Sequence, residues 1–208
     1  DDCSTDIETG NTNPIVSLDY INGFSIPLNT PFVLDGSATD LENDNLTYSW
    51  EEFDLGPKST PGSPTGDAPQ FVSEVPNETS ERYLPSLEKI INNQSDKTEV
   101  LPFYQKDMTW RLTVRDNNPA GGGSDWEEVQ FFASDQAGPF VVEYPTNTET
   151  FNAGSEQLIQ WDVANTDSHP VNCERVNILL SDNGGTTFPH LLVENAPNNG
   201  SHFVTVPN

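Results

Sequence analysis

An acidic stretch in the first quarter of the chain carries the side chains best suited to binding a metal ion. Asp40, Glu42, Asn43 and Asp44 lie within one short segment. Carboxylate and amide oxygens are the ligands that calcium prefers, and calcium takes about six to eight of them. The segment therefore predicts a calcium site; the alternative is a solvated turn whose carboxylates only keep a hairpin tip soluble. Its spacing does not fit an EF-hand, which needs a glycine and a final glutamate at fixed positions.

The residues on either side of this acidic loop read as strands that would hold it in place. An apolar run precedes the loop at 32–34, and apolar and polar residues alternate after it at 46–50. Alternation of this kind is typical of a strand with one buried face. We therefore expect the loop to connect two strands of one domain.

The composition separates the candidate partners by charge. The chain has 208 residues, with 33 acidic residues against 8 lysines and arginines, and a formal net charge of −25. Such a charge repels nucleic acid and anionic membrane surfaces and attracts cations. The sequence also contains no apolar run near the roughly 18 residues that indicate a transmembrane helix. We therefore expect no nucleic-acid partner and no membrane insertion.

The composition and the turn residues predict an all-β fold. Seventeen prolines and 14 glycines favour short strands joined by many turns, and 4 tryptophans and 11 phenylalanines argue against disorder. We divide the chain into a linker or tail at 1–13 and two tandem β-sandwiches at 14–135 and 136–208. The second sandwich has five strand-like runs, whereas such domains usually need about seven strands. We therefore expect it to be incomplete at its C-terminus, with an exposed strand edge.

Two features interrupt the first predicted sandwich. The segment 56–70 is rich in proline and glycine, which predicts a long surface excursion. Further along, 85–93 reads as a short helix with Ser86 as its N-cap. The side chains of this helix that we expect to pack against the sandwich are Leu87, Ile90 and Ile91.

The sequence lacks the signatures of the common catalytic sites. It contains no GxSxG nucleophile elbow and no Cys-x-x-Cys pair, and His169, His190 and His202 are too irregularly spaced for a zinc motif. Pairs of carboxylates for glycoside hydrolysis carry no information in a chain with 33 acidic residues. We therefore predict that this chain is not itself an enzyme.

Three smaller features leave alternatives open. Cys3 and Cys173 either pair with each other or stay unpaired, and an unpaired Cys173 reads as a small buried core residue. The run 181–188 is either an Asp-box hairpin, with Asn183 where that motif prefers aspartate, or an ordinary Asn-Gly turn. The tryptophans read as core residues, and Trp126 is the one that an alternative role in carbohydrate binding would use.

Four segments taken together resemble a known group of modules. They are DGSATDLENDNLTYSWEEFDLGP, RYLPSLEKIIN, MTWRLTVRDN with its GGG turn, and VNILLSDNGGTTFPHLL. They resemble the modules that follow the catalytic domain in bacterial secreted reprolysin-like zinc metallopeptidases. In that family the first module is similar to a cadherin- or polycystic-kidney-disease-type immunoglobulin-like sandwich, and the module after it resembles a fibronectin-type-III-like sandwich. The zinc helix HExxHxxGxxH of the family is absent here, so no catalytic residue is carried over.

The resemblance implies a calcium site at one pole of the first sandwich. In related modules the acidic loop and an aspartate that ends the penultimate strand come together near that pole. The matching residues in this sequence are Asp40, Asp44 and Asp116. Weaker candidates for the same site are Glu42, Asn43 and Asp125.

The resemblance also implies a function, namely a non-catalytic accessory region that spaces, stabilises or targets a catalytic domain upstream in the same polypeptide. Such a region is secreted or lies at the cell surface, and an extracellular protein or a polysaccharide is a further partner class. The first residues lack the features of a signal peptide, so we expect the chain to be a piece of a longer, processed protein. A calcium-rigidified segment of a bacterial surface adhesin is the alternative, and a carbohydrate-binding module is the third hypothesis.

Overall fold

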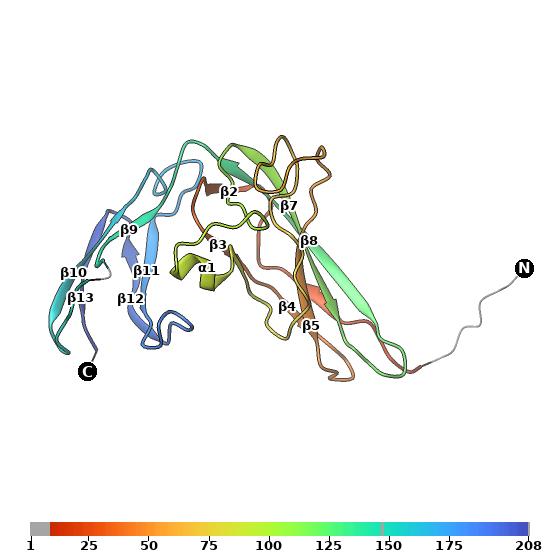
Figure 1. Cartoon of the computed structure of the whole chain (residues 1–208). Coiled ribbons are helices and arrows are strands. Elements are labelled where there is room, and N and C mark those ends of the chain that lie inside the picture. Colours follow the sequence, from red (N-terminus) through yellow and green to blue (C-terminus); the bar gives the residue numbers. More distant parts are fainter. Residues whose placement is uncertain (1–8, 147, 208) are drawn as a thin grey trace, which may run out of the picture.

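The computed structural model describes residues 9–146 and 148–207, and within these ranges the chain is built of strands with one short helix (Figure 1). The predicted all-β fold is therefore confirmed. Cys3, and with it any pairing to Cys173, lies outside the described residues. No helix in these two ranges is long and apolar enough to cross a membrane.

The strands of the first half share one hydrophobic core. Strands β2, β8, β7 and β5 form one sheet in that order, with β2 parallel to β8 and the other pairs antiparallel. Two further antiparallel pairs, β1 with β4 and β3 with β6, contribute side chains to the same core. The elements are β1 (Ile15–Ser17), β2 (Phe24–Pro27), β3 (Phe32–Leu34), β4 (Ser37–Thr39), β5 (Thr47–Glu52), β6 (Arg82–Leu84), α1 (Leu87–Ile91), β7 (Lys106–Arg115) and β8 (Ser124–Ser134).

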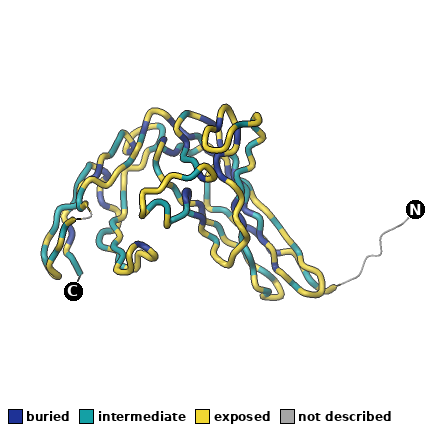
Figure 2. The backbone as a smooth tube through the Cα atoms, in the orientation of Figure 1, coloured by how far each residue is buried: buried dark blue, intermediate teal, exposed yellow. Residues whose placement is uncertain are grey.

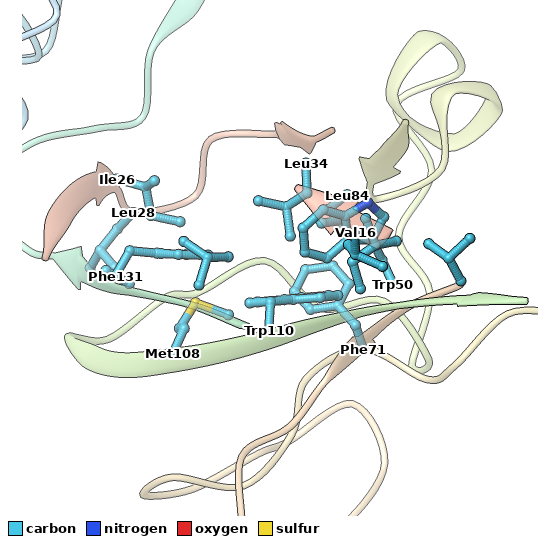
Figure 3. Packing of buried hydrophobic residues seen from close by; sticks show 14 residues of the cluster. Val16, Ile26, Leu28, Leu34, Trp50, Phe71, Leu84, Met108, Trp110 and Phe131 are labelled. Atoms are coloured by element: carbon cyan, nitrogen blue, oxygen red, sulfur yellow. The ribbon is translucent and has the colours of Figure 1, made fainter. Parts of the chain in front are cut away.

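Strand β7 forms one side of this core. Apolar and polar residues alternate along 108–115, which predicts a strand with one buried face, and the residues of β7 do alternate between buried and more exposed positions. Figure 3 shows Leu34 of β3 and Leu84 of β6 on the opposite side of the cluster from Trp110. The fully buried side chains of the strand are Met108, Trp110, Leu112 and Val114.

The long insertion after β5 is fixed to the sheet by buried charges. Lys106 Nζ lies 3.0 Å from Glu52 Oε1, 2.9 Å from Asp54 Oδ2 and 3.0 Å from the carbonyl oxygen of Ala68. Glu52 Oε2 accepts a hydrogen bond from the backbone N–H of Phe71 at 2.9 Å. Burial raises the pKa of the Glu52 carboxyl to about 7, although the Lys106 ammonium opposes this shift. The excursion predicted at 56–70 is thus anchored at its far end.

Helix α1 does not pack where the sequence predicts. None of its residues is buried, and Leu87, Ile90 and Ile91 are not among the side chains that pack on the core of the first half, so the expectation that they pack against the first sandwich is wrong. The polar side of the helix is held instead, because Lys89 Nζ lies 2.6 Å from Glu99 Oε2 and 3.0 Å from Asp96 Oδ2. Its apolar side faces the second half, where a Cβ atom on Gly185 would clash with Ile91.

The second half contains two separate sheets and a thin core. Strands β13, β10 and β9 form one sheet in that order, and β11 pairs with β12. Among the buried apolar residues only Trp161, Ala196 and Val204 come from 140–207, in keeping with the small amount of dark blue there in Figure 2. Each of the five predicted runs overlaps one of the strands, which are β9 (Val141–Tyr144), β10 (Glu156–Asp162), β11 (Arg175–Leu180), β12 (His190–Pro197) and β13 (Ser201–Thr205). The immunoglobulin-like character of both halves stays a prediction.

Of two smaller predictions about the second half, the burial of Cys173 is wrong and the hairpin turn at 181–188 is confirmed. Cys173 is exposed rather than buried, because it lies in the loop before β11, where its Sγ donates to the carbonyl oxygen of Arg175 at 3.4 Å. The segment 181–188 does form the turn of a hairpin, between β11 and β12. Gly184 and Gly185 adopt positive φ angles of 72° and 86° there, as an Asn-Gly-Gly turn requires.

The tryptophans divide as the strand alternation predicts. Trp50, Trp110 and Trp161 are buried, whereas Trp126 on β8 is 50% exposed. The indole Nε1 of Trp161 donates to Asn198 Oδ1 at 2.8 Å, so the only polar atom of that side chain is satisfied. Core packing is therefore the role of three of the four tryptophans.

Replacing Lys106 with methionine is expected to destabilise the protein by about 3–5 kcal/mol, because it leaves two buried carboxyls without their cation. The pKa of Glu52 is already raised, so its ionisation opposes folding more as the pH rises towards 7. The loss should therefore be larger at pH 8 than at pH 5, as measured by urea unfolding. Lys58→Met removes an exposed lysine and is the matched control. A loss that is the same for both variants would contradict the role given to Lys106.

Candidate functional site

Asp116 is the centre of a polar network at one pole of the first half. It directly follows β7 and is only 1% exposed, although it carries a carboxyl group. Its Oδ1 accepts hydrogen bonds from Gly123 N at 2.8 Å and Asn118 N at 3.1 Å, and its Oδ2 accepts one from Asn11 Nδ2 at 2.7 Å. The turn between β7 and β8 therefore wraps around one buried carboxylate.

The third residue of the GGG run makes this close wrapping feasible. A Cβ atom on Gly123 would lie 2.8 Å from Asp116 Oδ2 and 2.5 Å from Asn13 Oδ1. Both distances are shorter than real Cβ contacts, so any side chain would push the turn away from the carboxylate. The GGG run predicts a turn. The close approach of Gly123 to Asp116 explains why the third residue of the run is a glycine.

The N-terminal segment is bound to this pole. Asn11 Nδ2 also donates to Gly121 O at 3.0 Å, and Thr12 Oγ1 donates to Glu42 Oε2 at 2.8 Å. Sequence reasoning assigned 1–13 to a linker and missed Asn11, which lies 105 residues from Asp116 along the chain. The only signal in the sequence is chemical, because asparagine supplies both an oxygen acceptor and a nitrogen donor.

The acidic loop joins the same network through one asparagine. Asn118 Nδ2 donates to Asp44 Oδ2 at 2.8 Å and to Asn11 Oδ1 at 3.2 Å. Asp40 Oδ1 in turn accepts a hydrogen bond from the backbone N–H of Asp44 at 2.8 Å. Asp40 Oδ2 is buried but has no hydrogen-bond partner in the described part of the chain. The pole thus contains a desolvated carboxylate oxygen without a partner.

Of the six predicted ligands, three come together in this network and three lie at its edge or serve another purpose. Glu42 reaches only the edge of the network, through Thr12. Asn43 is exposed and has a positive φ of 60°, so it shapes the turn with its backbone. Asp125 lies on β8 and accepts a hydrogen bond from the backbone N–H of Val16 at 3.2 Å, which ties it to β1. The three that the network brings together are Asp40, Asp44 and Asp116.

The chemistry of this donor set fits calcium, although its geometry is that of a hydrogen-bonded network. Among the residues that the structure describes, no group of three or more histidine, cysteine or acidic side chains is arranged to hold a metal ion. The amide nitrogen of Asn118 instead lies between oxygens of Asp44 and Asn11. Carboxylate and amide oxygens are nevertheless the ligands that calcium takes. Asp40 Oδ2 has no hydrogen-bond partner in the described part of the chain, so this oxygen is free to bind a calcium ion.

The network keeps Asp116 ionised. Burial tends to raise the pKa of its carboxyl, but the hydrogen bonds from Asn11 Nδ2 and from the N–H groups of Asn118 and Gly123 together outweigh this effect. The pKa of Asp116 therefore lies below its ordinary value. A carboxyl whose pKa is lower in the folded state stabilises the protein above about pH 4, and this contribution is lost as the pH falls through the folded pKa.

Comparisons with known proteins give no family assignment. No protein-family model matches the sequence, and no curated protein matches it either. A function is therefore inferred from the residues and contacts of this chain.

Replacing Asp116 with asparagine is expected to lower the free energy of unfolding by about 2–3 kcal/mol at pH 7, because an amide nitrogen would then face backbone N–H donors. The difference from the unmodified protein should shrink as the pH falls towards 3, because the carboxyl of the unfolded state is protonated there and the contribution of the folded carboxylate declines. Urea unfolding in calcium-free buffer at the two pH values measures both effects. Asp107→Asn, at an exposed position on the same strand, is the control for charge. An equal loss at pH 7 and pH 3 would argue against an ionised Asp116.

Proposed function

We propose that this chain is a non-catalytic accessory region of a secreted protein, and that calcium bound at the pole of its first half stabilises it. The observation that carries the proposal is Asp40 Oδ2, a buried carboxylate oxygen without a partner, in a loop tied to Asp44 and Asn118. A buried charged oxygen without a compensating contact costs several kcal/mol. A bound cation removes that cost directly.

A cation at this pole would link parts of the chain that are far apart in sequence. The network joins the N-terminal segment at Asn11, the acidic loop at Asp44, and the turn at Asp116 and Asn118. A ligand that binds only the folded protein stabilises it by about 2.7 kcal/mol at a concentration 100 times its Kd. It also offsets part of the self-repulsion of a chain with a net charge of −25. Both effects suit a spacer in a calcium-containing extracellular medium.

The resemblance to accessory modules of secreted metallopeptidases supports the same conclusion. On this proposal the partner is a catalytic domain upstream in the same polypeptide, and this chain performs no chemistry itself. The adhesin alternative keeps the calcium site and changes only the neighbouring domains. The parent polypeptide separates the two, because an upstream HExxHxxGxxH segment supports the peptidase and a tandem array of this module supports the adhesin.

The geometry around Trp126 argues against the carbohydrate-binding alternative. The guanidinium of Arg111 lies 4.2 Å from the centre of the Trp126 ring and 3.6 Å from the centre of the Phe53 ring. One face of the indole is therefore covered by a cation that is also paired with Glu128 at 2.7 Å. A sugar ring stacks on an open aromatic face. Arg111 already occupies one face of the Trp126 indole.

Calcium added to chelator-treated protein is expected to give a saturable heat in isothermal titration and a rise in Tm. Asp44→Ala should abolish both responses, because it removes a carboxylate from the network. Asp19→Ala removes the same charge at an exposed position outside the network and should retain both. Magnesium at the same concentration should raise the Tm less, because it demands a tighter octahedral shell. The calcium site is refuted by the absence of heat and of any Tm change in the unmodified protein.

A further inference from the structure

A large apolar cavity opens inside the second half and reaches the first. Its volume is about 940 Å³, and the sheet of β9, β10 and β13 contributes Ile159, Trp161 and Val204 to its lining. The opposite side is bounded by Leu87 and Ile90 of α1. In Figure 1, α1 lies between the strands of the first half and β11. The apolar side of the helix, which has no core to pack on, is therefore one wall of this cavity.

The way β11 borders the cavity shows that a strand edge, and not only a sheet face, is open. Side chains alternate between the two faces of a strand, so a cavity over a face touches every second residue. Strand β10 follows that pattern, with Gln157, Ile159 and Trp161 in the lining. In β11, by contrast, all six consecutive residues 175–180 border the cavity. The cavity therefore runs along the edge of β11.

That edge has no strand beside it in the described part of the chain. Strand β11 pairs only with β12, and these two form a sheet of their own. An unpaired edge presents a row of N–H and C=O groups that a further strand can pair with. Here that row of groups adjoins an apolar groove.

We propose that this groove binds an extended polypeptide strand. The backbone of the bound strand pairs with the free edge of β11, and its alternate apolar side chains cover Trp161, Ile159 and Val204. Its other side contacts Leu87 and Ile90. The added strand thereby extends the sheet of β11 and β12 and encloses the thin core of the second half. This is recognition by strand addition, in which main-chain hydrogen bonds give affinity and alternate side chains give specificity.

The dimensions favour a strand over a small molecule. The six residues of β11 span about 20 Å at about 3.3 Å each, which is the length of an average strand. The volume is at the upper end of the range of about 300–1,000 Å³ found for small-molecule sites. A small apolar molecule would also leave the N–H and C=O groups of the β11 edge without partners beside an apolar surface, which is unfavourable.

The charge of the second half defines the chemistry of the bound strand. Residues 139–207 contain eight acidic residues and Arg175 as their one lysine or arginine. A second copy of the chain brings a net charge of −25 to a partner of the same charge, so the two repel each other. Arg175 is the one charged residue in the described lining of the groove, so the stretch of the occupant that lies in the groove is an uncharged strand with alternating apolar side chains.

The test uses an acetylated and amidated peptide of about eight residues that alternates valine and threonine between terminal lysines. A second peptide carries backbone N-methyl groups on alternate residues, which removes its pairing edge and keeps its side chains. Fluorescence anisotropy with the whole chain measures binding, and hydrogen exchange locates it. We expect the first peptide to bind and to protect the amides of 175–180. The N-methylated peptide should bind at least about tenfold more weakly.

Two variants at exposed positions control for misfolding. Val142 is 58% exposed and lines the groove, whereas Leu191 is 52% exposed and lies outside it. Val142→Lys should therefore weaken peptide binding, and Leu191→Lys, with the same change of charge, should not. Equal binding of both peptides would show a simple apolar pocket and overturn the proposal. Protection away from β11, no binding at millimolar peptide, or a dimer that protects β11 in sedimentation and exchange measurements would overturn it as well.

Discussion

Burial of one face of β7 is the constraint on which the first half depends. Its fully buried side chains fix the position of the strand in the sheet, and that position fixes both of its ends. Lys106 at the start lies between Glu52 and Asp54 and anchors the long insertion. Asp116 just beyond the end lies among N–H donors and organises the pole. A ten-residue strand is about 33 Å long, so one packing interaction positions two distant charge centres.

The sequence predicted those parts of the fold that depend only on neighbouring residues. The alternation along β7, the inward tryptophans and the turn at 181–188 each follow from residues close together in the chain. The acidic loop predicted Asp40 and Asp44, and only the family resemblance placed Asp116 with them. Asn11 and Asn118 escaped prediction because their partners depend on how distant segments meet, and polar residues in loops have no periodicity. The exposure of Cys173 and the orientation of α1 likewise depend on tertiary contacts.

The two halves differ in how completely their apolar residues are covered. The first half packs Trp110 among side chains from several of its strands. In the second half, Val142 and Phe203 are more than half exposed, and the core rests on Trp161 and its hydrogen bond to Asn198. Because few buried contacts mean a low free energy of local opening, the second half should open more readily than the first. The folding of the second half therefore depends more than that of the first on contacts made with something outside it.

The scarcity of lysine and arginine has a consequence for how readily certain proteases cut this protein. Of the 8 such residues, Arg82, Lys89, Lys106 and Arg111 are engaged in ion pairs within the first half. Proteases of the trypsin type recognise a basic side chain, which must enter their specificity pocket. Half of the basic side chains are thus held by carboxylates of the protein itself. These ion pairs therefore also reduce the number of sites at which such proteases can cut.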